Sequence, residues 1–173
     1  MNQELQHLIK RLKQDGDKTA AFFGSLEPQA WRAQVYTTGS EWTVRDVLAH
    51  FVSAERSFKE LVNDVAAGGK GAPRDLMIDD FNETEVPKLG PLSPEELLDA
   101  YRSARRASIE LAMGLDPNVL DLRGYHPWFG DVEIRAMLKL VYRHNMIHLR
   151  DIRSALKSGA PTPHKDIDPP TAR

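Results

Sequence analysis

Two histidines lie four residues apart in the last long apolar-patterned segment of this 173-residue chain. His144 and His148 fall within a stripe of apolar residues that runs from Ile134 to Ala155 in steps of three and four. In an α-helix, residues four apart lie one above the other on the same face, so both imidazoles would project toward the core. Burying two such rings without polar partners costs free energy. A metal ion would satisfy both, because neutral imidazole is a common metal ligand.

A third histidine could complete such a site from a different helix. His50 flanks the apolar stripe of an earlier segment, between Val47 and Ala54. Two ligands from one helix and one from another would form a three-nitrogen site inside a bundle. Zinc sites with three protein ligands leave a fourth position for water or substrate, where the metal acts as a Lewis acid or generates hydroxide. The alternative is that these are core histidines satisfied by hydrogen bonds.

The other histidines and two nearby carboxylates receive simpler interpretations. The remaining histidines are interpreted as surface or loop residues: His7, His126 and His164. The loop that contains His126 could face the site or pack against the end of the bundle. Asp46 lies one turn before His50, and Asp151 lies three residues after His148, so either carboxylate could orient an imidazole. Local spacing favours a capping box for Asp46 and a salt bridge with a neighbouring arginine for Asp151.

Four segments with helical periodicity predict the fold class. They run from about Asn2 to Leu26, from Thr43 to the glycines at 68 and 69, from Ser93 to Gly114, and from about Asp131 to Lys157. No segment alternates apolar and polar residues convincingly, so no sheet is expected. Four amphipathic helices can bury their stripes against one another. The prediction is an all-α four-helix bundle with two long connecting loops, from Pro28 to Trp42 and from Gly68 to Leu92.

Composition limits the classes of function. The formal net charge of −2 offers no electrostatic grip on nucleic acid, and no apolar run is long enough to span a membrane. The absence of cysteine excludes disulfides, thiolate ligands and a cysteine nucleophile. The N-terminal residues lack the apolar core of a signal peptide, so a cytoplasmic location is expected. One domain is expected over residues 1–157, followed by a flexible, polar tail over residues 158–173.

Three segments resemble the DinB-like superfamily of metal-binding four-helix bundles. They are residues 42–51 with Trp42 and His50, residues 79–83 with Phe81, and the pair His144 and His148. The resemblance covers roughly residues 1–157, by helix order as well as by motif. It implies a divalent metal, most often zinc or nickel, held by His50, His144 and His148. Its characterised members include thiol-dependent transferases and isomerases and also hydrolases, which implies a low-molecular-weight thiol as a second cofactor.

The leading interpretation is therefore a metal-dependent enzyme that acts on a small molecule. The metal would lower the pKa of a coordinated thiol or water near neutral pH. A thiol transferase and a metal-dependent hydrolase cannot be separated by sequence, because both need the same open position. The competing class is a non-catalytic small-molecule-binding or protective protein with a structural metal. Catalytic residues other than metal ligands are not assigned.

Aromatic residues in the connections should close one end of the site. At least two of a group of four are expected to line a cavity over the metal: Trp42, Phe81, Trp128 and Phe129. Capping the bundle core is their alternative role. The resemblance also implies a homodimer, for which the sequence offers only Phe22 and Ile109, two apolar residues outside the core stripes.

Overall fold

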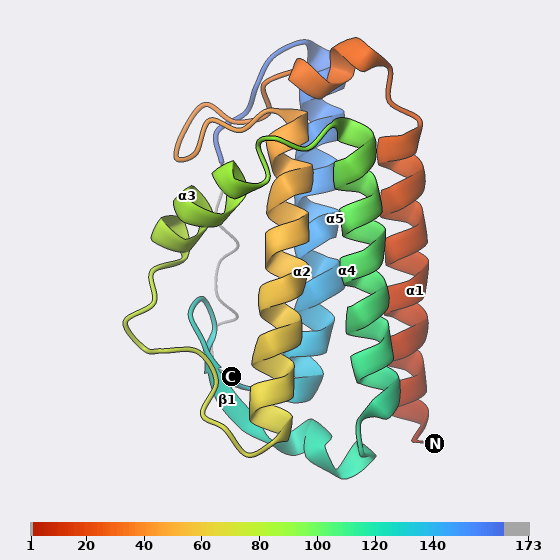
Figure 1. Ribbon diagram of the computed structural model, residues 1–173, viewed down its shortest axis with the longest axis vertical. Coiled ribbons are helices and arrows are strands. Elements are labelled where there is room, and N and C mark those ends of the chain that lie inside the picture. Colours follow the sequence, from red (N-terminus) through yellow and green to blue (C-terminus); the bar gives the residue numbers. More distant parts are fainter. Residues whose placement is uncertain (1, 165–173) are drawn as a thin grey trace.

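Four long helices form the body of the computed structural model, which describes residues 2–164 (Figure 1). They are α1 (Gln3–Gly24), α2 (Val44–Ala66), α4 (Pro94–Gly114) and α5 (Ile134–Ser158). Capping boxes start two of them: Thr43 with Asp46 begins α2, and Ser93 with Glu96 begins α4. The expected all-α four-helix bundle is confirmed. No helix in the described part of the chain is long and apolar enough to cross a membrane.

The order and direction of the helices explain both long connections. Both α1 and α2 pack against α4 and α5, so α1 and α2 lie diagonally across the bundle. The first connection contains a short 3-10 helix, η1 (Pro28–Arg32), and crosses one end of the bundle to span this diagonal (Figure 1). Figure 1 also shows that α2 and α4 run in the same direction, so the chain must travel back along the bundle between them.

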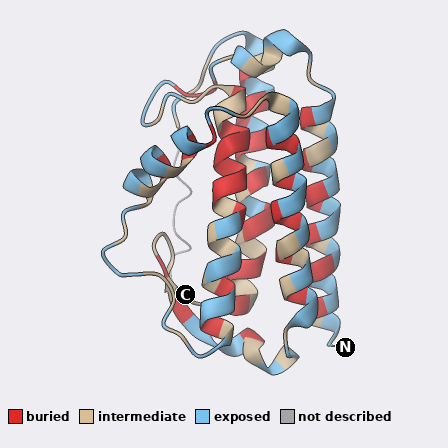
Figure 2. Ribbon diagram, in the orientation of Figure 1, coloured by how far each residue is buried: buried red, intermediate tan, exposed pale blue. Residues whose placement is uncertain are grey.

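That return segment was expected to be a loop, but it contains a helix. α3 (Ile78–Lys88) lies beside α2 and contacts it. Only two of its residues are buried, Asn82 and Val86, so its buried face is narrow. Figure 2 shows most of the helix exposed. A helix with so little amphipathic character leaves no clear periodic signal in the sequence.

The expectation that the chain contains no sheet was wrong at one place. After a second 3-10 helix, η2 (Pro117–Asp121), strands β1 (Arg123–His126) and β2 (Gly130–Glu133) pair as an antiparallel hairpin. The strands have four residues each, too few to show a convincing alternation. The hairpin takes up the residues that precede Ile134, and α5 therefore begins three residues later than the expected start at Asp131.

The bundle core consists of two apolar clusters separated by a buried polar layer. One cluster includes Phe23, Phe51 and Ile152, and the other includes Leu8 and Met137. Figure 2 shows the buried residues following the inner faces of the long helices. Phe22 and Ile109, on which the sequence argument for a dimer rested, pack partly against these two clusters within their own chain. The homodimer itself stays a prediction.

Arg105 is the centre of the polar layer. This side chain of α4 is 3% exposed and pairs with Glu55 of α2 and Asp15 of α1, at nitrogen–oxygen distances of 2.5 and 3.1 Å. Ser108 donates a second hydrogen bond to the Glu55 carboxylate at 2.8 Å. Gly16 makes room for the arginine, because a Cβ there would lie 2.8 Å from Arg105 Cγ. The glycine that weakens the α1 pattern therefore has a packing role.

The end of the described chain returns to the start of α2. α5 ends at Ser158 and is followed by Gly159, whose φ of 69° is the left-handed conformation that glycine adopts readily. Thr162 then exchanges backbone hydrogen bonds with Val35 and Thr37. The expected tail over residues 158–173 is therefore hydrogen-bonded to the domain near Thr162, and residues 165–173 lie outside the described part.

Candidate metal centre and pocket

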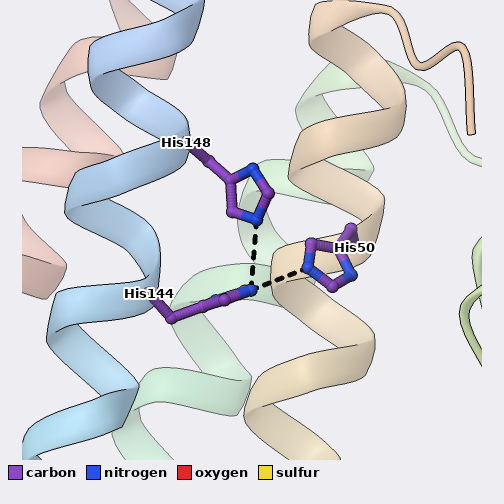
Figure 3. A group of neighbouring side chains, drawn as sticks. All are labelled: His50, His144 and His148. Atoms are coloured by element: carbon purple, nitrogen blue, oxygen red, sulfur yellow. Dashed lines mark hydrogen bonds between the residues drawn. The ribbon is translucent and has the colours of Figure 1, made fainter. Parts of the chain in front are cut away.

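Three imidazoles from two helices converge on one point. His50 comes from α2, and His144 and His148 come from α5, as Figure 3 shows. The Nε2 atom of His144 lies 2.8 Å from Nε2 of His50 and 3.2 Å from Nε2 of His148. His50 and His148 are 6% and 5% exposed, and His144 is partly exposed. The spacing that predicted a shared face on the last helix is therefore realised, and the α2 histidine faces it.

A hydrogen-bond chain fixes the tautomer of His148. Its Nδ1 lies 2.6 Å from the Tyr36 hydroxyl, which donates to Asp151 Oδ2 at 3.2 Å. A carboxylate only accepts, so the one hydroxyl proton of Tyr36 points to Asp151 and the oxygen accepts from Nδ1–H of His148. The tautomer is inferred from these partners. Nε2 of His148 is therefore left with a bare lone pair that points to the other two rings.

The same logic applies to His144 on the neighbouring turn. Its Nδ1 lies 3.3 Å from Asn145 Oδ1, and the amide nitrogen of Asn145 donates to the Tyr101 hydroxyl at 3.0 Å. Asn145 is 1% exposed, so no bulk water competes for these atoms. The amide oxygen accepts, which puts the proton of His144 on Nδ1 and leaves its Nε2 as a lone pair.

His50 is held by packing more than by hydrogen bonds. Its ring lies against the Trp42 ring, with centroids 4.6 Å apart and planes at 31°. Its Nδ1 makes no hydrogen bond of normal geometry, although the Asn82 side chain on α3 is close enough to act on the ring. Trp42 precedes α2 and Asn82 belongs to α3, so the connections on both sides of α2 position this histidine.

These partners show that the site fits a divalent cation. Two Nε2 lone pairs, those of His144 and His148, face each other at 3.2 Å with no proton left to place between them. Nitrogen ligands about 2.0–2.1 Å from a tetrahedral zinc ion would lie about 3.3 Å from one another, close to the separations seen here. The three histidines are the one group of this kind in the described chain whose ligand atoms all lie within 4.8 Å. Their assignment as metal ligands stays a prediction with this support.

Burial keeps the three rings neutral. Burial lowers the pKa of His144 to about 4, and it lowers the pKa of His50 and His148 well below the usual 6.5, helped by the charges of the neighbouring histidines. Imidazole must be neutral to bind a metal ion. The site is therefore prepared to bind a cation at neutral pH without first releasing protons.

A pocket opens directly beside the histidines. Its cavity volume is about 160 Å³, it is open to solvent on one side, and all three histidines line it. All four aromatic residues expected near the metal line it as well: Trp42, Phe81, Trp128 and Phe129. Other walls are aliphatic, such as Leu76 of the return segment and Leu140 of α5. The mostly apolar lining with a few convergent polar groups is typical of a small-molecule site, while the binding role of the four aromatic residues stays a prediction.

Two histidines interpreted as surface or loop residues belong to this pocket. His126 is 7% exposed, because the hairpin folds it against Phe58 of α2. His164 reaches the pocket through the pairing at Thr162, and its ring stacks on His148 at 5.7 Å. Both placements depend on tertiary contacts that local sequence does not carry. His7 is exposed, as expected.

The two carboxylates behave as local spacing indicated, with one addition. Asp46 forms the capping box of α2. Asp151 pairs with Arg150 at 3.0 Å through Oδ1, and its other oxygen supports His148 through Tyr36. Tyr36 itself was missed, because nothing near it in the first connection distinguishes a tyrosine that reaches the site from one that caps the bundle.

Comparisons with known proteins find one family model and several similar structures. The model of the DinB superfamily matches residues 11–152. The structure of YfiT from Bacillus subtilis, described as a probable metal-dependent hydrolase with an unusual four-helix bundle topology, has a TM-score of 0.72 and 17% identity, covering 92% of this chain and 91% of that one. A mycothiol-dependent maleylpyruvate isomerase has a TM-score of 0.73 and 12% identity, covering 88% of this chain. A histidine-to-alanine mutant of that isomerase has a TM-score of 0.72.

These similarities differ in how much of each relative they cover. The chain spans 63% of the isomerase's length, but nearly all of YfiT. At 12% and 17% identity, the likeness establishes the fold alone. A search of curated protein sequences finds no match.

Proposed function

This chain belongs to the DinB superfamily, and on that premise we propose that it is a metal-dependent enzyme acting on a small-molecule substrate. The proposed cofactor is one divalent ion, zinc or nickel, held by His50, His144 and His148. The observation that carries the proposal is the convergence of their Nε2 atoms beside an apolar pocket, with the lone pairs of His144 and His148 left bare.

Each part of the chain has a defined task in this proposal. The histidines hold the ion, which when bound lowers the pKa of a coordinated thiol or water. Tyr36 and Asn145 keep Nε2 of His148 and His144 free of protons. The aromatic walls exclude bulk water, which strengthens electrostatic interactions at the reacting group. Because the chain contains no cysteine, a sulfur nucleophile must come from a low-molecular-weight thiol.

We place thiol transfer first and water-dependent hydrolysis second. Thiol transfer comes first because a mycothiol-dependent maleylpyruvate isomerase shares this fold. The second candidate is favoured by the description of YfiT as a probable metal-dependent hydrolase, since this chain covers 91% of it. The pocket adjoining the histidines argues against a purely structural metal, because a structural site has no need of an open cavity.

Metal analysis followed by two activity screens tests the proposal. Protein purified without an affinity tag should contain close to one equivalent of zinc or nickel, and His148→Ala should contain almost none. His7→Ala is the matched control, because His7 is exposed and outside the site. Full metal content in His148→Ala would remove the assignment.

The screens then separate the two reactions. Metal-loaded protein is incubated with electrophiles and small thiols to detect conjugates, and with esters and amides to detect hydrolysis. Conjugation that His148→Ala abolishes would support the transferase, whereas metal-dependent hydrolysis without a thiol would support the hydrolase. Bound metal with neither activity would support the non-catalytic binding protein.

A further inference from the structure

His126 occupies a place in the pocket that the metal site does not explain. It ends β1, and its ring stacks on Phe58 with centroids 5.4 Å apart and planes at 22°. The ring centroid of Phe129, in the hairpin turn, lies 5.3 Å from that of His126, with the planes at 58°. The imidazole is thus packed against two aromatic rings in the wall of the pocket, which also contains His144.

One nitrogen of this ring is occupied and the other is not. Nδ1 of His126 accepts a hydrogen bond from the backbone N–H of Trp128 at 3.1 Å. In a neutral imidazole, an accepting Nδ1 places the proton on Nε2. Nε2 has no hydrogen-bond partner among the residues that the structure describes, although the ring is 7% exposed. A neutral N–H donor in the pocket wall is therefore available to a bound molecule.

The other walls restrict what that molecule can be. They are mostly aromatic and aliphatic, and neither lysine nor arginine lines the pocket within residues 2–164. Asp79 is the one acidic residue of the lining, and it lies at the exposed edge. An ionised carboxylate or phosphate buried here, away from the histidine triad, would lack a cationic partner, which is costly.

We propose that the pocket binds an uncharged, largely apolar substrate, and that His126 orients it by donating a hydrogen bond from Nε2 to its one polar acceptor. This inference rests on the proposed function for the position of the reacting group, which lies beside the three histidines. It adds the chemical class of the substrate and a positioning residue that is not a metal ligand.

Three naphthalene probes test the substrate class. 2-Acetylnaphthalene carries a neutral acceptor, 2-ethylnaphthalene has the same shape without a strong acceptor, and 6-acetyl-2-naphthoate adds a carboxylate at the far end. Binding is measured by quenching of tryptophan emission, since Trp42 and Trp128 line the pocket. The full chain is used both metal-loaded and metal-stripped, because a ketone or carboxylate could also coordinate the ion.

The metal-stripped protein should separate the three probes clearly. The ketone should bind about five- to tenfold more tightly than the ethyl compound, the factor expected for one neutral hydrogen bond. The naphthoate should bind at least tenfold more weakly than the ketone. Equal or tighter binding of the naphthoate would overturn the uncharged class, and equal binding of the ketone and the ethyl compound would overturn the role of His126.

Two substitutions distinguish the donor from a structural role of the ring. His126→Phe keeps the aromatic stacking, and His126→Asn can keep a side-chain acceptor for the Trp128 N–H in an Asx-type turn. Both should bring the ketone and ethyl compounds to within twofold of each other, while binding of the ethyl compound stays close to that of the unchanged protein. A ketone preference that survives in both variants would refute the proposal.

Metal analysis and probe binding together distinguish failure of the proposed function from failure of this inference. If metal analysis finds no ion but the probes are discriminated as expected in a His126-dependent way, the substrate class holds and the metal chemistry falls. If the ion is bound but the probes are not discriminated, the metal site holds and this inference falls.

Discussion

Replacing Tyr36 with phenylalanine should weaken metal binding without changing any metal ligand. Tyr36 is fully buried, and its hydroxyl oxygen lies 2.6 Å from Nδ1 of His148, from which we infer that it accepts a hydrogen bond. Without that oxygen, the metal-free protein can relax by moving the His148 proton to Nε2, where it can be donated to His144. The metal-bound protein cannot relax in this way, because Nε2 must carry a lone pair. It is left with a buried, unsatisfied Nδ1–H.

The size of the effect follows from that unsatisfied donor. A buried donor without a partner costs about 1–3 kcal/mol, and each 1.4 kcal/mol is tenfold in an equilibrium constant. Metal affinity in Tyr36→Phe should therefore fall about 10- to 100-fold, in agreement with the usual cost of removing a hydrogen-bond partner of a metal-binding histidine. Competition with a chromophoric chelator at pH 7.5, on protein first stripped of metal, measures the change.

Tyr142→Phe is the matched control for this experiment. Tyr142 is also buried and belongs to α5, but its ring packs in the other apolar cluster, with the Arg11 guanidinium 5.2 Å from its centroid. The metal affinity of the Tyr142→Phe variant should stay within twofold of that of the unchanged protein. If Tyr36→Phe also stays within twofold, the hydroxyl does not control the tautomer of His148, and the argument from bare lone pairs loses its main support.

Three further expectations concern stability, pH and assembly. Arg105→Ala leaves Glu55 and Asp15 as buried, uncompensated carboxylates, so the free energy of unfolding in urea should fall by about 3–5 kcal/mol. A loss below about 1 kcal/mol would contradict the claim that these ion pairs are buried. The metal-free protein should be most stable above about pH 6.5 and should lose stability as the pH falls toward 4. Burial lowers the pKa of His126 and His144 to about 4, so the unfolded chain takes up their protons first, and each shift corresponds to about 3 kcal/mol. A free energy of unfolding in urea that stays flat across this pH range would refute the prediction. Light scattering at micromolar concentration should give the mass of a homodimer, and a monomeric mass would end that proposal.

The sequence predicted the parts of the fold that depend on local chemistry. Helical periodicity identified all four long helices, and the capping residues Thr43 and Ser93 located the starts of two of them. Spacing on one helix placed His144 and His148 together, because that relation is fixed by helix geometry alone. The position of His50 beside an apolar stripe made it a candidate partner, and the family resemblance strengthened that prediction, since no local rule sets how two helices rotate toward each other.

The features that the sequence did not predict depend on tertiary contacts. α3 has a narrow apolar face, and the hairpin strands have four residues each, so neither gave a periodic signal. His126 was taken for a loop residue, although it is buried once the hairpin packs on Phe58. Tyr36 reaches His148 across 112 positions of sequence, and its partner Asp151 already had a sufficient local explanation in Arg150. Buried polar networks of this kind become visible only when the elements are assembled.

The histidines and many of the pocket-lining residues lie on different parts of the fold, so substitutions at them have different consequences. The histidines belong to α2 and α5, whose inner faces also make the core, so substitutions there disturb folding as well as metal binding. About half of the residues that line the pocket lie outside the long helices, in the return segment with α3 and in the hairpin turn, and the rest come mostly from α2 and α5. The exposed and partly exposed lining residues of these two segments, such as Asp79, Trp128 and Phe129, can therefore change at small cost to stability. Such changes would reshape the pocket while the group of three histidines stays in place.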